Sequence, residues 1–288
     1  MIPPRARGSV LLALTLLVGL GSPRAAPAVD RHRDDAGQPV GVAALLGDDV
    51  SWPQCPHGQP LPRPGAFVII GLTSGTALHR NPCLDEQLAW GTRSRRPLAA
   101  YTMVNPPTPA ELRRDQKGPL QACTGHGSKR LLCAFGNAGA SEALFTLRTL
   151  AARGWQTGLV WADVEIRTTQ PWRGGQQPAN RALLAGFDAT LRAAGVRAGY
   201  YSSAYQWRLI TGGWKPPADS PEWYAIGTGG VPALRAACRQ SFAGGPTAIT
   251  QSVWGNHDKD LACPASQPIV TAMSLHLPAT AALATRQR

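Results

Sequence analysis

The chain has 288 residues, with 29 lysine and arginine residues against 17 aspartate and glutamate residues, which gives a formal net charge of +12. This length is sufficient for one large domain with a substantial core. A basic protein is attracted to anionic polymers, but no arginine cluster alternates with aromatic residues on one element, so nucleic acid is a weak candidate partner. No segment beyond the first residues is apolar for long enough to form a transmembrane helix.

The N-terminal segment has the three parts of an export signal. Arg5 and Arg7 give a positive start, an apolar run follows at 10–20, and small residues lie at 25–28. The apolar run is too short to span a bilayer, and a buried N-terminal helix is the alternative. We therefore predict a signal peptide at 1–28 and a secreted, extracellular protein that can associate with the cell wall.

Six cysteines follow, and an even number in an exported chain favours three disulfides. Pairing each cysteine with the next along the chain is the preferred one of several possible arrangements. There is no CxxC pair and no histidine at ligand spacing from a cysteine pair, so neither a metal nor another cofactor is expected. The predicted pairs are Cys55 with Cys83, Cys123 with Cys133, and Cys238 with Cys263.

After a flexible lead-in at 29–46, short apolar runs alternate with amphipathic helical segments. Two helices are clearest: one is capped by Ser141 and stopped by Gly154, and the other is preceded by Asn180 and ended by Gly195. Weaker helices are predicted at 84–90, 204–209 and 231–241. Strands are predicted at 48–52, 67–73, 98–104, 158–166, 196–202, 222–227, 247–253 and 259–263.

Strands that alternate with helices indicate parallel βαβ units, and about eight strands in one domain favour a closed barrel. An open doubly wound sheet is the alternative, but no GxGxxG follows a strand. The predicted fold class is α/β, a single TIM-like (β/α) barrel at 47–265 with disulfide-stapled loops. Within it, the Pro- and Gly-rich segment 105–138 is interpreted as an insertion held by Cys123 and Cys133, and 266–288 as a C-terminal tail.

The strand at 158–166 is the most informative one, because alternate residues of a strand face opposite sides. One face carries Leu159, Trp161, Asp163 and Glu165, and the other carries Val160, Ala162, Val164 and Ile166. The first face becomes acidic only near the C-terminal end of the strand, where barrel enzymes place their active sites. Paired acids suit glycoside hydrolysis, in which one acid protonates the leaving oxygen and another stabilises the oxocarbenium ion, attacks it or activates water. A solvated strand end or an ion pair with an arginine is the alternative.

Further acids lie near the first and last predicted strands, which are neighbours in a closed barrel. Asp49 lies in the first strand, and Asp258 and Asp260 lie near the last one, so these acids could face Asp163 and Glu165 across the barrel mouth. A turn role is the alternative for Asp258 and Asp260. Tryptophans in or just after strands offer flat apolar faces to a sugar, although each alone is more often part of a core. These are Trp52, Trp161, Trp172, Trp207, Trp223 and Trp254.

Other catalytic motifs are missing from the sequence. The segment at 71–75 is not a GxSxG elbow, and there is no HExxH, no Walker loop and no dinucleotide fingerprint. Six cysteines in disulfides leave no thiol for a cysteine nucleophile.

A series of short motifs carries a family resemblance through its order: DVS at 49–51, FVII at 67–70, AY at 100–101, DVE at 163–165, GYYSS at 199–203, and Asp260. In this order they resemble glycoside hydrolase family 25, which comprises secreted muramidases with a TIM-like barrel. The resemblance covers about residues 47–263. It implies that Glu165 is the general acid and that Asp49, Asp163 and Asp260 are supporting carboxylates. Together with the tryptophans, it gives the expected substrate contacts Trp52, Tyr101, Trp161, Tyr201, Gln251 and Trp254.

The chain departs from the family in several places. The family's Tyr-His-Phe after the third strand is YTM at 101–103, and its Trp-Gln-Tyr is TQS at 250–252. The SWPQCP segment at 51–56 and the insertion at 105–138 resemble instead a poorly characterised, secreted, glycoside-hydrolase-like branch from Gram-positive bacteria.

The resemblance implies a muramidase-type glycoside hydrolase that acts on bacterial cell-wall glycan, with a cell-wall polysaccharide as its partner and a monomer as its expected state. One alternative is a barrel that binds wall glycan without cutting it. Another is a structural envelope protein whose basic surface binds anionic polymers.

Overall fold

The computed structural model describes residues 46–55, 58–166, 171–172, 175–255, 257–264 and 269, all within the unit that spans Val40–Arg288. The predicted signal peptide at 1–28 lies outside the described residues. So do all but the last residue of the lead-in and all but one residue of the C-terminal tail. These three assignments therefore stay predictions.

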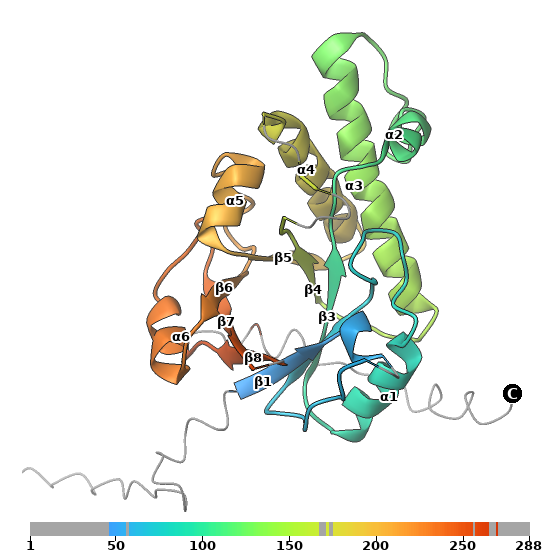
Figure 1. Ribbon diagram of the computed structural model, residues 1–288. Helices are drawn as coiled ribbons and strands as arrows, with labels where there is room; N and C mark the ends of the chain where they lie inside the picture. Colours follow the sequence, from blue (N-terminus) through green and yellow to red (C-terminus); the bar gives the residue numbers. More distant parts are fainter. Residues whose placement is uncertain are drawn as a thin grey trace, which may run out of the picture. The chain divides into compact units, whose positions relative to one another are not determined.

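Eight strands form a closed barrel, which confirms the predicted fold class (Figure 1). Each strand from β1 to β6 pairs in parallel with the next, whereas β8 is antiparallel to both β7 and β1. The expectation of parallel units is therefore wrong for β8, because the two residues between β7 and β8 allow only a hairpin. The strands are β1 (Leu46–Val50), β2 (Val68–Gly71), β3 (Leu98–Met103), β4 (Leu159–Asp163), β5 (Arg197–Ser202), β6 (Glu222–Thr228), β7 (Thr247–Trp254) and β8 (His257–Ala262).

Six α-helices and one short 3₁₀ helix accompany the strands in the described part of the chain. None of these helices is long and apolar enough to cross a membrane. The helices are η2 (Trp52–Gln54), α1 (Leu84–Arg93), α2 (Pro109–Asp115), α3 (Gly127–Ala151), α4 (Gln177–Ala193), α5 (Ala204–Thr211) and α6 (Val231–Ala237).

The predicted starts of the two clearest helices are wrong. Helix α3 begins at Gly127, so Ser141 lies in its middle, and α4 begins three residues before Asn180. The side chain of Asn180 is buried and donates to the carbonyl of Ile210 at 2.8 Å, so it joins α4 to α5 instead of capping α4. The segment 105–138 contains α2 and the first half of α3, and its assignment as an insertion stays a prediction.

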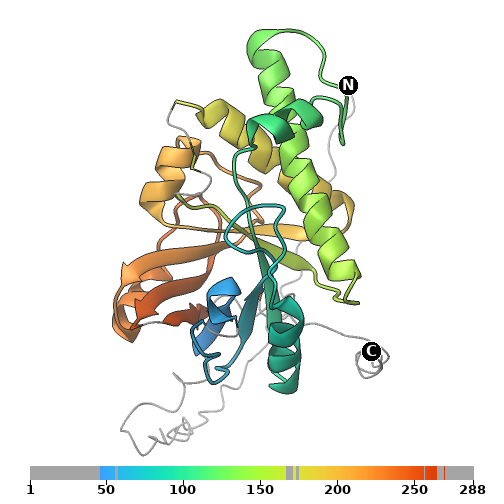
Figure 2. The ribbon, with the colours of Figure 1, turned by 45° about the vertical axis from the view of Figure 1, so that its right-hand side comes forward.

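Helices α3 and α4 lie side by side on one side of the barrel, and glycines allow their close approach (Figures 1 and 2). A Cβ atom on Gly139 of α3 would lie 1.9 Å from the carbonyl oxygen of Leu183 in α4. One on Gly186 of α4 would lie 2.0 Å from the carbonyl oxygen of Gly136. The backbones therefore touch where side chains would otherwise separate them.

The apolar residues form two clusters, one inside the barrel and one between the barrel and its helices. In β4, Leu159 and Trp161 belong to the inner cluster, and Val160 and Ala162 belong to the outer one, together with Val164 after the strand. This confirms the predicted alternation. It fails only at Ile166, which is 43% exposed because it lies three residues beyond the end of β4.

Three disulfides are present, with the predicted pairing: Cys55–Cys83, Cys123–Cys133 and Cys238–Cys263. The first joins the residue that follows η2 to the residue that precedes α1. The second joins the segment after α2 to Cys133 within α3, and the third joins the end of α6 to the end of β8.

Candidate active site

A pocket lies at the C-terminal ends of the parallel strands. It is lined by Met103 and Asp163, the last residues of β3 and β4, and by residues that follow β1 and β2. Its four carboxylates are Asp49, Asp163, Glu165 and Asp258, and its four aromatic side chains are Trp52, Tyr101, Tyr201 and Trp223. The structure therefore brings most of the predicted site residues to one end of the barrel.

Asp163 and Glu165 face the same pocket because they are two residues apart at the end of β4. Asp163 is buried and Glu165 is half-buried. The backbone between them is fixed, since the N–H of Val164 donates to the carbonyl of Tyr201 and the hydroxyl of Ser202 donates to the carbonyl of Val164. The indole N–H of Trp172 donates to the carbonyl of Glu165 at 3.1 Å. The two carboxylates therefore project from a backbone held on both sides.

Asp49 is held by a chain of side-chain hydrogen bonds across the barrel mouth. The hydroxyl of Tyr201 donates to Oε1 of Gln251 at 2.6 Å, and Nε2 of Gln251 donates to Oδ2 of Asp49 at 2.8 Å. Burial raises the pKa of the Tyr201 hydroxyl well above its usual value, so this group remains a donor. The chain fixes the orientation of the Gln251 amide and, through it, that of Asp49.

Asp260 lies beneath the pocket and does not line it. It is fully buried, and its Oδ1 accepts the indole N–H of Trp223 at 2.8 Å. Its Oδ2 has no N–H or hydroxyl donor, but its carboxyl group is hydrogen-bonded to that of Asp49. Such a contact between two acids requires a proton on one of them, and Asp260, whose pKa this bond raises, is the donor. Asp260 therefore supports Asp49 from below.

The pKa values of this pair indicate where the proton is held. Burial raises the pKa of Asp49 to about 8, and the negative charge of Asp258 adds to the rise. Burial, followed by the charge of Asp49, raises the pKa of Asp260 well above its usual value. A protonated carboxyl group therefore lies at the barrel mouth at neutral pH, opposite the carboxylates of β4.

The predicted aromatic contacts divide into two groups. Trp52, Tyr101 and Tyr201 line the pocket, and Trp52 is 46% exposed, packed over Gly75. The prediction that Trp161 contacts substrate is wrong: it is fully buried in the barrel interior, where it packs edge-on against Trp223 with ring centroids 5.9 Å apart.

Three other tryptophans also lie away from the pocket lining. The indole N–H of Trp254 is directed to the carbonyl of Gly229 and the hydroxyl of Ser252, so the structure does not bring this ring to the site. Trp172 and Trp207 belong to the cluster between the barrel and its helices.

Two residues that the sequence analysis noted as candidates, but that are not among the expected catalytic acids or substrate contacts, complete the pocket. Trp223 forms its floor, with the rings of Tyr101 and Tyr201 against it at centroid distances of 5.9 and 4.6 Å. Asp258 supplies a fourth carboxylate. Both were noted in the sequence, but the place of Asp258 depends on the direction of β8, and that of Trp223 on how deep its side chain lies in the barrel. Within the described residues, no group of three or more histidine, cysteine, aspartate or glutamate side chains is arranged to hold a metal ion.

Comparisons with known proteins match parts of this chain to lysozymes. A family model described as Lysozyme-like protein 1 matches residues 133–242, which include Asp163 and Glu165. The probable GH family 25 lysozyme 4 of Dictyostelium discoideum is 40% identical over 68 residues, 24% of this chain and 30% of the relative. The matches span less than half of the length of the curated relatives.

Solved structures show the same architecture. The muramidase from Acremonium alcalophilum matches with a TM-score of 0.55 and 17% identity, covering 80% of this chain and 98% of that one. The muramidase from Trichobolus zukalii matches with a TM-score of 0.53 and 18% identity, and again covers 80% of this chain and 98% of that one. The chain shares their fold. The organisms of these relatives do not bear on the predicted branch from Gram-positive bacteria, which stays a prediction.

Proposed function

We propose that this protein is a glycoside hydrolase that cleaves the β-1,4-linked amino-sugar chain of peptidoglycan, with the activity of a muramidase. The observation that carries the proposal is the pair Asp163 and Glu165, which project from the end of β4 into a pocket walled by aromatic rings. Similarity to lysozymes over the segment that contains this pair supports the same chemistry.

The proposed roles follow from where the carboxyl groups lie. Glu165 is half-buried at the pocket, so it can reach the leaving glycosidic oxygen as general acid. Asp163 is buried two residues before it, where a negative charge stabilises the oxocarbenium-like transition state. Asp49, protonated below about pH 8, offers a hydrogen bond to a sugar hydroxyl or to the carbonyl of an acetamido group.

The remaining walls suit a sugar ring. Trp52 presents an exposed indole face, and Tyr101 and Tyr201 line the pocket beside it. Aromatic faces stack on the apolar side of a pyranose, and their polar edges hydrogen-bond to its hydroxyls. The site therefore combines a carboxylate pair with surfaces that can hold a glycan across it.

We further propose that the protein is secreted and belongs to the glycoside hydrolase family 25 lysozymes, in a branch from Gram-positive bacteria. Three disulfides support export from the cytoplasm. The branch rests on the SWPQCP and 105–138 segments of the sequence. Recovery of the protein from culture medium with a new N-terminus near residue 29 would support export, whereas retention of the intact chain inside the cell would contradict it.

Incubation of the purified protein with peptidoglycan tests the activity. Mass spectrometry of the soluble fragments would be compared for wild type, Glu165→Gln and the matched Glu86→Gln, which changes an exposed glutamate on α1. We expect fragments with new reducing ends from wild type and Glu86→Gln and none from Glu165→Gln. If no variant releases fragments but all sediment with the polymer, the protein is a glycan-binding barrel and the proposal fails.

A further inference from the structure

Three cations gather on the lobe formed by α2 and the start of α3. A guanidinium nitrogen of Arg130 on α3 donates to the side-chain oxygen of Gln116, which follows α2. Gln116 and Lys117 are three and four residues after Arg113 in a helical stretch, so these three side chains lie on the same face. All three cations are exposed. We name Arg113, Lys117 and Arg130 the cationic face of the lobe.

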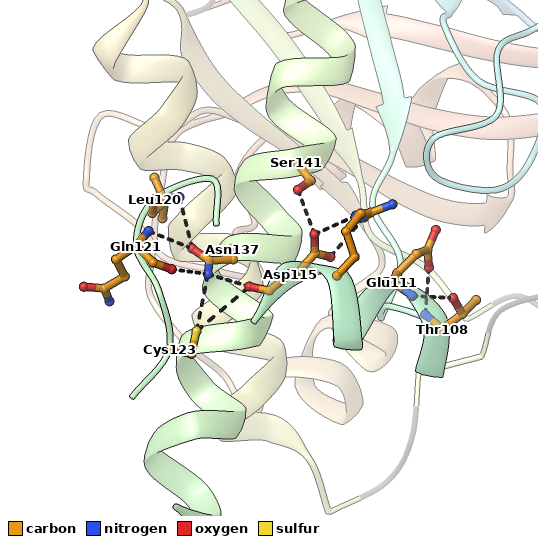
Figure 3. Close-up of polar contacts among 9 residues, drawn as sticks. Thr108, Glu111, Asp115, Leu120, Gln121, Cys123, Asn137 and Ser141 are labelled. Carbon is orange, nitrogen blue, oxygen red and sulfur yellow. Dashed lines mark hydrogen bonds and ion pairs between the residues drawn. The ribbon is translucent and has the colours of Figure 1, made fainter. Parts of the chain in front are cut away.

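The acids of the lobe do not neutralise this face. The carboxylate of Glu111 accepts the backbone N–H of Thr108 at 2.7 Å at the start of α2 (Figure 3). Asp115 is buried and is paired with the guanidinium of Arg114 at 3.0 Å. Among the residues that the structure describes, no ion pair involves a member of the cationic face. The face therefore presents to solvent three positive charges that are not in ion pairs.

Hydrogen bonds, drawn in Figure 3, and a disulfide join the parts of the lobe. The buried side chain of Asn137 on α3 accepts the N–H groups of Leu120 and Gln121 and donates to the carbonyls of Asp115 and Gln121. The disulfide Cys123–Cys133 closes the same turn. A charged surface held in place in this way loses little conformational freedom when it binds a ligand.

The cationic face lies at the end of the barrel that carries the pocket. Helix α2 follows the C-terminal end of β3, and α3 returns toward the N-terminal end of β4, so the α2–α3 turn projects beyond the strand ends that line the pocket (Figure 1). A polymer bound to this face would therefore be held beside the site where the glycan is cleaved.

We infer that the cationic face is a docking surface for a flexible polyanion of phosphodiester-linked units in the bacterial wall. Guanidinium groups bind phosphate oxygens with two parallel N–H donors, and three cations along one face can pair with the phosphate charges that repeat along a phosphodiester polymer. Nucleic acid fits less well, because the lobe sequence at 108–131 contains no phenylalanine, tyrosine or tryptophan on which bases could stack. The location of the polymer in the wall rests on the proposed function, whereas the binding chemistry does not.

Binding of labelled poly(glycerol phosphate) to the full exported protein tests this inference. The variant R113Q/K117Q/R130Q removes the face and leaves Asp115, Asn137 and the disulfide intact. The matched control R93Q/R95Q/R96Q removes three exposed arginines, the last residue of α1 and two residues between α1 and β3, at the opposite end of the barrel. We expect about tenfold weaker binding for the first variant, which is about 1.4 kcal/mol in total. The control should lose less than about twofold, and binding should weaken as salt increases.

Several outcomes would overturn the inference. Equal losses in the two variants would mean that net charge, and not the cationic face, attracts the polymer. Unchanged binding in R113Q/K117Q/R130Q would remove the face from the interaction. Tighter binding of single-stranded DNA with the same number of phosphates would replace the wall polymer by nucleic acid. Because Glu165→Gln should bind the polymer like wild type, this experiment can fail or succeed independently of hydrolysis.

Discussion

The carboxyl group of Asp49 should titrate at a lower pH when the charge of Asp258 is removed. Burial is the largest cause of its raised pKa of about 8, and the charge of Asp258 is the next. Strands β1 and β8 pair Gly47 with Asp260, so the same register continued by two residues places Asp49 opposite Asp258. Side chains opposite each other on antiparallel strands are about 5 Å apart at Cβ.

The size of the effect follows from this separation. Two charges about 5 Å apart at an effective dielectric constant of about 20 interact by about 3 kcal/mol, which corresponds to about 2 pKa units. Asp258→Asn keeps the size of the side chain and removes its charge. We therefore expect the pKa of Asp49 to fall from about 8 to about 6 in this variant.

The same change has a consequence for stability. A carboxyl group whose pKa is raised on folding stabilises the fold while it is protonated, and this contribution is lost as pH rises from the unfolded pKa to the folded one. For Asp49 the loss extends from about pH 4 to about pH 8. In Asp258→Asn it should end near pH 6, so above pH 8 the variant should be more stable than wild type by about 3 kcal/mol, with no gain at pH 4.

Carboxyl ¹³C chemical shifts of aspartate-labelled protein, assigned with Asp49→Asn, would give the titration midpoint. Urea unfolding at pH 4 and pH 9 would give the two stabilities. Glu86→Gln, which removes an exposed negative charge on α1, is the control and should change neither measurement. An unchanged midpoint in Asp258→Asn would show that burial alone holds the proton on Asp49, and the argument from the β1–β8 register would be refuted.

Three further predictions concern the contact of α3 with α4, one disulfide and two tryptophans. Gly139→Ala should lower the free energy of unfolding by about 2 kcal/mol, because its Cβ would lie 1.9 Å from the carbonyl oxygen of Leu183. In the control Gly136→Ala, the nearest atom to the new Cβ is 3.6 Å away, so this variant should not be destabilised. Equal urea midpoints for the two variants would contradict the tight contact of α3 with α4. Replacing Cys123 and Cys133 by serine should cost about 3 kcal/mol for a loop with a sequence separation of 10, measured by thermal unfolding, and an unchanged melting temperature would contradict it. Trp161→Ala should lower the free energy of unfolding by about 4 kcal/mol, because the ring is fully buried, whereas Trp52→Ala should mainly weaken glycan binding measured by calorimetry. If Trp161→Ala instead weakened glycan binding and Trp52→Ala lowered stability, Trp161 would be a substrate contact after all.

The strand pattern and the cysteine order were predictable because each depends on local rules. Alternation of apolar residues with acids at the end of β4 fixed which side of the strand faces the pocket, and the structure places Asp163 and Glu165 there. The same rule could not tell how far down the barrel each inward side chain lies. Trp161 is two residues before Asp163 on the same face and is covered by Trp223, so it belongs to the core.

Helix starts were predicted less well because tertiary contacts override local capping signals. Serine is a favoured N-cap residue, which is why the helix was predicted to start at Ser141, and Gly136 and Gly139 weaken a helix in isolation. In the folded chain they allow the backbone of α3 to touch α4, and the packing gained along that contact continues the helix back to Gly127. Contacts of this kind join residues about fifty positions apart, and no short sequence window contains both partners.

The direction of β8 explains why the fourth carboxylate of the pocket is Asp258. In a parallel strand, the later residue of an inward-facing pair lies nearer the mouth, which would favour Asp260. Since β8 runs from the mouth into the barrel, the earlier residue reaches the pocket and Asp260 lies below it, against Trp223. Lys259, between them, faces the other way and is paired with the buried Asp48. The hairpin therefore separates one open carboxylate from one buried beneath Asp49. Burial is the main reason that a proton stays at the barrel mouth at neutral pH, and the charges of the neighbouring acids add to it.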